Sequence, residues 1–171
     1  MPNHIPCILT ISGNGGTIAD LIEFVKGPGA VFKESPVEAE CRIRHNLATG
    51  KPADFVPPPE ASAFECHKII PVPPDVLAQP YGDGPSVGYN WCVKNWGTKW
   101  GAYEVQAAHT ESGDNAFLCY TFMCAWEPCL PVIEALVQKY PTLTFEFRWV
   151  DVYDDSKHTR KWEPQEVKTN G

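Results

Sequence analysis

Apolar residues recur at every second position in three segments of the chain, residues 4–12, 103–107 and 143–149. In the last of these segments the apolar residues are Leu143, Phe145, Phe147 and Trp149. A period of two is typical of a β-strand that buries one face, and the polar residues between the apolar ones indicate that the other face is wet. A fourth strand over 116–125 follows the turn sequence SGDN at 112–115, which predicts a β-hairpin.

Two segments have the helical period instead. The first begins after the loop GNGG, with Thr17 as the expected N-cap, and ends at Gly27. The second begins at Pro128 and ends at Pro141. Their apolar positions are Ile18, Leu21, Ile22 and Val25 in the first helix, and Ile133, Leu136, Val137 and Tyr140 in the second.

These elements follow one another in the order βαββαβ, interrupted by a long insertion. This order predicts an α+β, ferredoxin-like domain over residues 1–153, with a four-stranded antiparallel sheet and two helices. The insertion covers about 28–100 and contains most of the 17 prolines and many of the 13 glycines. The residues 154–171 are expected to form a C-terminal tail that is mobile or serves as a partner-binding extension.

The insertion contains one clear helix start, the sequence SPVE at 35–38. It reads as a capping box with proline at the first helical position and predicts a helix over about 36–48. A strand is the alternative, because Val37, Ala39, Cys41 and Ile43 also alternate with charged residues. Apolar residues such as Phe55, Phe64 and Ile69 indicate that the insertion packs on the sheet or along its edge.

Charge and cysteine content limit the classes of partner. The chain has 14 basic and 21 acidic residues, a net charge of −7, which opposes binding to nucleic acid or a membrane and favours a basic partner. No secretory signal or long apolar run is present, so we expect a cytoplasmic protein without a membrane segment. The seven cysteines, an odd number without tight pairs, are expected to be reduced and mostly buried.

The segment WCVKNWGTKW is the most unusual stretch of the sequence, with three tryptophans and two lysines in ten residues. In one interpretation the tryptophans attach the insertion to the sheet. In another they form a binding site, in which an indole stacks on a base, a lysine meets a phosphate and a polar side chain reads a base edge. A protein-interface hot spot is a third interpretation. The candidate binding residues are Trp91, Lys94, Asn95, Trp96, Thr98, Lys99 and Trp100.

Other chemistry has little support in the sequence. The GNGG loop lacks the lysine of a phosphate-binding P-loop, and a strand-to-helix turn explains it. No cysteine pair has the spacing of a zinc site, so no metal is expected. No nucleophile elbow and no cofactor motif is present, which favours a binding protein over an enzyme.

Four stretches resemble a known family: PNHIPCILTISG, FECHKIIPVPPDVL, WCVKNWGTKWGAYEV and FMCAWEPCLPVIEALVQKYPTLTFEFRW. Together they resemble the YubB-like family of small phage and plasmid proteins, which includes Api-type phage proteins with a ferredoxin-like domain. This chain has Gly101 and Cys124 where the family pattern has aspartate and threonine. The resemblance implies a phage or mobile element as the source and an uncharacterised accessory protein that acts in the host cell by binding.

Three functions therefore stay open. The first is a phage- or plasmid-encoded protein that binds and inhibits a host defence or regulatory component, an anti-defence host interaction with a basic protein or complex. The second is sequestration of a signalling nucleotide through residues 91–100. The third is binding of single-stranded nucleic acid, which the net charge opposes.

Overall fold

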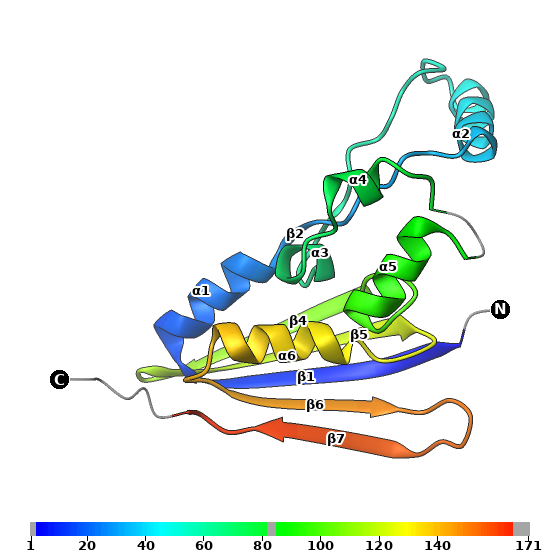
Figure 1. Ribbon diagram of the computed structural model, residues 1–171. Helices are drawn as coiled ribbons and strands as arrows, with labels where there is room; N and C mark the ends of the chain where they lie inside the picture. The colour runs from blue at the N-terminus through cyan, green and yellow to red at the C-terminus, as the bar shows by residue number, and fades with distance from the viewer. Residues whose placement is uncertain (1–2, 82–84, 166–171) are drawn as a thin grey trace.

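The computed structural model describes residues 3–81 and 85–165 and places helices over one face of a large β-sheet (Figure 1). The main strands of this part are β1 (His4–Asn14), β4 (Tyr103–Ser112), β5 (Asn115–Ala125), β6 (Thr144–Val150) and β7 (Lys157–Trp162). Two further strands, β2 (Gly27–Pro28) and β3 (Ala61–Ser62), form a small separate ribbon. The helices are α1 (Gly15–Val25), α2 (Pro36–Ala48), α3 (Cys66–Ile69), α4 (Pro74–Leu77), α5 (Val87–Trp96) and α6 (Leu130–Lys139).

The sheet is antiparallel throughout, with the order β4-β5-β1-β6-β7. The α+β class is confirmed, but the prediction of four strands and two helices is wrong. In the described residues the sheet has five strands and the chain forms six helices. The additional strand, β7, lies within residues 154–171, which were predicted to form a C-terminal tail.

Pairing with its neighbours stabilises β7, although its sequence KHTRKW has no apolar face. The strand pairs with β6 along its whole length, and the Lys161 ammonium lies 2.7 Å from a carboxylate oxygen of Glu146 on β6. The Arg160 guanidinium lies 2.7 Å from Glu134 on α6 and 5.2 Å from the ring centroid of Trp162. The pairing with β6 and the two ion pairs involve residues distant in sequence, so the local pattern of the segment could not predict the strand.

The core lies between the sheet and its helices, and β1 and β6 bury the face that the alternation predicted. The buried residues of the three central strands are Ile5, Cys7, Leu9 and Ile11, then Leu118, Tyr120, Phe122 and Cys124, then Phe145 and Phe147. Their opposite-face neighbours on β1 and β5, such as Ile8 and Met123, are only half-buried. The described residues therefore leave the second face of the sheet without a covering layer of helices.

Helix α1 begins three residues earlier than the sequence predicted. Asn14, not Thr17, is the N-cap, and its side-chain oxygen accepts a hydrogen bond from the Thr17 backbone N–H at 3.1 Å. The Gly15 N–H donates to the Asp114 carbonyl in the β4-β5 turn at 2.9 Å. This contact between distant segments fixes the helix start, and it explains why GNGG is a strand-to-helix turn.

The insertion divides into a packed part and a projecting arm. In the packed part, the Phe64 ring stacks on Phe122 with centroids 5.1 Å apart and planes 9° apart, so the insertion does pack on the sheet. The arm, residues 31–60, carries α2 away from the sheet (Figure 1). The predicted capping box is confirmed, with Ser35 and Glu38 each accepting a hydrogen bond from the other's backbone N–H.

The helices of the described part are short, and α2 is the longest at 13 residues. None of them combines the length and the apolar content that a membrane crossing would need.

Candidate functional site

Most of the tryptophan-rich segment lies on helix α5, which the sequence did not predict. The Ser86 side chain caps its start by accepting a hydrogen bond from the Tyr89 N–H at 3.1 Å. Gly97 ends it in the left-handed conformation, with φ of 76°. A Cβ at this glycine would lie 2.9 Å from Cδ of Pro131, so the helix end also packs closely against α6.

Three of the candidate residues are held by hydrogen bonds to backbone groups. The Trp96 indole N–H donates to the Ile70 carbonyl at 2.9 Å, and the Asn95 amide donates to the Trp91 carbonyl at 2.9 Å. Thr98 is 1% exposed; its hydroxyl donates to the Ala125 carbonyl at 2.9 Å and accepts from the Ala125 N–H at 3.1 Å. These polar side chains support the fold, and their inward bonds leave little freedom to read a ligand.

The other four candidate residues are accessible to different degrees. Lys94 is exposed, and Trp91 is half-buried with its ring at 86° to Trp96 and centroids 5.5 Å apart. The Lys99 ammonium lies 4.9 Å from the ring centroid of half-buried Trp100. Of the seven candidates, Trp96 and Trp100 line the same cavity.

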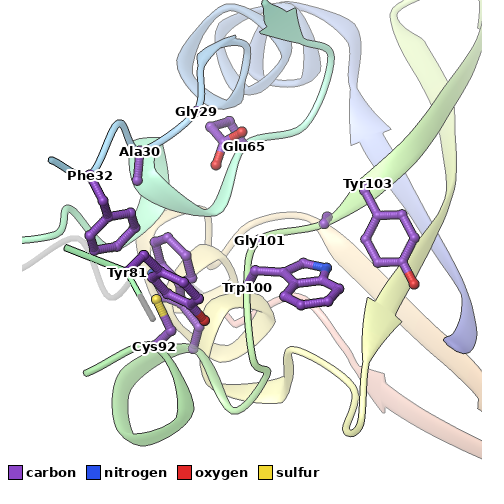
Figure 2. A pocket seen from close by; sticks show the side chains of 11 residues that line it. Gly29, Ala30, Phe32, Glu65, Tyr81, Cys92, Trp100, Gly101 and Tyr103 are labelled. Carbon is purple, nitrogen blue, oxygen red and sulfur yellow. The ribbon is translucent and has the colours of Figure 1, made fainter. Parts of the chain in front are cut away.

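This cavity, which we call the aromatic pocket, has a volume of about 370 Å³ and lies between the insertion and the start of β4 (Figure 2). That size is within the range of small-molecule sites. Five of its eleven lining residues are aromatic, and one is a carboxylate. The lining residues are Gly29, Ala30, Phe32, Glu65, Tyr81, Cys92, Trp96, Trp100, Gly101, Ala102 and Tyr103.

Two pairs of rings stand on different sides of the aromatic pocket (Figure 2). Phe32 and Tyr81 have centroids 4.9 Å apart with planes at 61°, and Trp100 and Tyr103 have centroids 6.2 Å apart with planes at 62°. The Tyr81 hydroxyl donates to the Lys99 carbonyl, and the Tyr103 hydroxyl shares a hydrogen bond with His4. These bonds hold the two tyrosine rings in place.

Glu65 is the charged residue of the pocket, and the sequence analysis missed it. Its side chain is the N-cap of the short helix α3, where Oε1 accepts a hydrogen bond from the His67 N–H at 3.2 Å. The residue is 6% exposed, and this burial raises the pKa of the carboxyl, while the backbone N–H groups of His67 and Cys66 oppose the rise. The signal in the sequence was a single acidic residue inside the apolar stretch AFECHKII.

Five of the seven cysteines are buried, as predicted, while Cys41 is exposed and Cys119 half-buried. Burial raises the pKa of Cys92, in the pocket wall, to about 12, so this thiol stays protonated at neutral pH. In residues 3–81 and 85–165, no three His, Cys, Asp or Glu side chains are arranged to hold a metal ion.

The comparisons with known proteins bear on the fold. No protein-family model matches the chain, and no curated protein matches it. The structure is similar to the crystal structure of a protein api92 from Yersinia pseudotuberculosis, described with the DUF1281 family model, with a TM-score of 0.60. The two sequences are 9% identical, and the similarity covers 96% of this chain and 95% of that chain.

At 9% identity this similarity shows a common fold and carries no activity from one protein to the other. It agrees with the Api-type part of the resemblance at the level of a distant, uncharacterised fold family. The YubB-like and phage parts of that resemblance stay predictions.

Proposed function

We propose that this chain is a non-catalytic binding protein and that the aromatic pocket is its site for a small ligand with a flat ring. A nucleotide is the ligand class that suits the site, with its base between the rings and its phosphate near Lys99. The protein would then sequester the nucleotide, which is the second function that the sequence left open.

The observation that carries this proposal is the wall of the pocket. Half-buried Trp100 faces a cavity of about 370 Å³ in which Phe32, Tyr81 and Tyr103 supply further ring surfaces. Stacking of a base on an aromatic side chain contributes about 1–3 kcal/mol and tolerates any base. Lys99, beside Trp100, has no carboxylate partner among the ion pairs of the described residues, and it is therefore available to an anionic group.

Titration of tryptophan fluorescence with a panel of nucleoside mono- and diphosphates tests this proposal, together with the melting temperature of the protein. A ligand that binds only the folded state raises the melting temperature, by an amount set by its concentration relative to Kd. Trp100→Ala should abolish both the quenching and the shift. Trp91→Phe is the matched control, because Trp91 belongs to the same cluster but does not line the pocket. Equal binding by the Trp100 variant would refute the proposal.

Inhibition of a host protein is the second candidate, and the projecting arm favours it. Six large apolar side chains of residues 31–60 are at least 37% exposed: Val31, Val37, Ile43, Leu47, Phe55 and Val56. Exposed apolar groups on one segment are typical of protein-binding surfaces. The arm is also internally fixed, since the Arg42 guanidinium bonds to Glu34 and to the carbonyls of Ala53 and Phe55.

Pull-down from a bacterial lysate with wild type and with a Val37→Glu, Leu47→Glu double variant tests this second candidate. Both side chains are more than 60% exposed, so the charges should not disturb folding. A protein retained by wild type and by the Trp100→Ala variant, but lost with the double variant, would support binding through the arm. Capture that is indifferent to the arm substitutions would exclude it.

A further inference from the structure

We propose that the Glu65 carboxylate selects ligands that present two adjacent N–H donors on a flat group, as the N1–H and N2–H edge of guanine does. This inference rests on the proposed function and names the substrate class of the same pocket. A guanidinium group has the same pair of donors, and the experiment below distinguishes the two sources.

The first step of the argument is that Glu65 is held rigidly at the pocket. Its backbone N–H donates to the Val25 carbonyl at 2.9 Å, and its Oε1 accepts from the His67 N–H at 3.2 Å. Two glycines make room for the carboxylate: a Cβ at Gly101 would lie 3.3 Å from Oε1, and one at Gly29 would lie 3.2 Å from Oε2. Both glycines line the pocket, so the carboxylate lies between them at its wall (Figure 2).

The second step is that the carboxylate has unused acceptor capacity. An ionised carboxylate offers about four lone-pair positions. In the described part of the chain Glu65 forms no ion pair, and the hydrogen bond at its side chain comes from the backbone of α3. A buried carboxylate that receives few hydrogen bonds is costly, and further donors from a ligand would offset that cost. A carboxylate in an otherwise apolar wall therefore indicates a ligand that carries N–H donors.

The third step is the shape of the space next to the carboxylate. Trp100 and Tyr103 lie on one side of the pocket, and Phe32 and Tyr81 lie on the other (Figure 2). Ring faces favour a flat group, and a cation above a ring gains additional attraction. A flat group with paired N–H donors can therefore contact the rings through its faces and Glu65 through its edge.

The fourth step is discrimination between bases. The edge of adenine places an acceptor nitrogen beside its amino group, so a carboxylate that receives one hydrogen bond from adenine also faces a lone pair. Guanine donates two hydrogen bonds at the same position. A good bidentate contact discriminates by about 10-fold to 100-fold between the right and the wrong base.

The test is isothermal titration of the full chain with GMP, AMP and agmatine, a guanidinium compound without a base. We expect GMP to bind about 10-fold to 100-fold more tightly than AMP. Glu65→Gln should remove this preference while leaving weak stacking of both nucleotides. Glu60→Gln, an exposed carboxylate of the same insertion, is the matched control and should behave as wild type.

A second variant keeps the test informative if Glu65→Gln disturbs α3. Gly101→Ala adds a methyl group 3.3 Å from Oε1 of Glu65, which should crowd the edge of the ligand and reduce the GMP preference without removing the carboxylate. Equal affinity for GMP and AMP in the wild type would overturn the inference and leave the proposed function standing. If agmatine binds and GMP does not, the paired N–H donors remain the group that Glu65 recognises, but the ligand is a guanidinium compound and not a nucleotide. If none of the three ligands binds, both proposals fail.

Discussion

Thr98 provides the most direct test of the roles that the structure assigns to the tryptophan-rich segment. The sequence suggested that this hydroxyl could read a ligand, whereas the structure buries it and directs it to the backbone of Ala125. Thr98→Val replaces the hydroxyl by a methyl group of nearly the same size. The substitution thus removes two hydrogen bonds and leaves the shape of the core unchanged.

The expected loss of stability follows from the hydrogen-bond partners that the backbone N–H and carbonyl of Ala125 keep in the Thr98→Val variant. The Ala125 carbonyl still accepts the Lys99 N–H at 3.2 Å, so it retains a partner. The Ala125 N–H loses the hydroxyl and stays buried, because Ala125 is 0% exposed. An unsatisfied buried donor costs about 1–3 kcal/mol. We expect the free energy of unfolding to fall by about 2 kcal/mol, and the melting temperature by about 4–8 °C for a chain of this size.

Urea unfolding followed by tryptophan fluorescence measures this change, and Thr98→Ser is the matched control. The serine keeps both hydrogen bonds and loses one buried methyl group, a cost of about 0.8 kcal/mol. The valine variant should therefore be the less stable of the two, with the denaturant slope unchanged. A valine variant within about 0.5 kcal/mol of wild type, or one more stable than the serine variant, would refute the structural role of the hydroxyl.

Three further predictions concern charge, thiols and the arm. Because burial raises the pKa of Glu65 above its ordinary value of 4.5, the folded state binds this proton more tightly than the unfolded state, and the free energy of unfolding of wild type relative to Glu65→Gln should fall as the pH rises above that value. A relative stability that stays constant in urea titrations at several pH values would contradict this. Ellman's reagent should react fast with exposed Cys41, slowly with Cys119 and with the five buried thiols only after unfolding; three or more fast thiols in native protein would contradict their burial. Ser35→Ala should destabilise α2 by about 1 kcal/mol, seen as faster proteolysis of the arm, and a large fall in the melting temperature would instead couple the arm to the core.

The sequence predicted those elements whose apolar periodicity lies entirely within their own residues. The alternation around Leu9 and around Phe145, and the apolar stripe around Ile133, each specify one buried face, and the structure has strands and a helix at these places. Helix α5 was missed because its apolar residues do not form one stripe: Cys92 and Trp96 are buried, but Val93 is 43% exposed. The residues that cap its two ends, Ser86 and Gly97, are present in the sequence, but caps alone do not predict a helix without such a stripe.

Two of the seven candidate binding residues, Trp96 and Trp100, line the aromatic pocket. Its other contributions come from segments far apart in the chain, including Phe32, Glu65 and Tyr103. No local spacing connects these residues, because the pocket is formed only when the insertion folds back on the sheet. A sequence pattern can single out a cluster of aromatic residues, but the carboxylate that lines the same pocket is found only from the three-dimensional structure.

The polar character of β7 matters for how copies of this protein meet one another. The strand forms one edge of the sheet, and its basic side chains, including Lys157, Arg160 and Lys161, are exposed there. Two copies that approached through this edge would bring like charges together, which discourages strand-to-strand association. A chain ending before Lys157 would expose β6 instead, with the sequence TFEFRWV, whose aromatic residues favour pairing with any free strand. The basic side chains of β7 therefore oppose association of copies through this edge of the sheet.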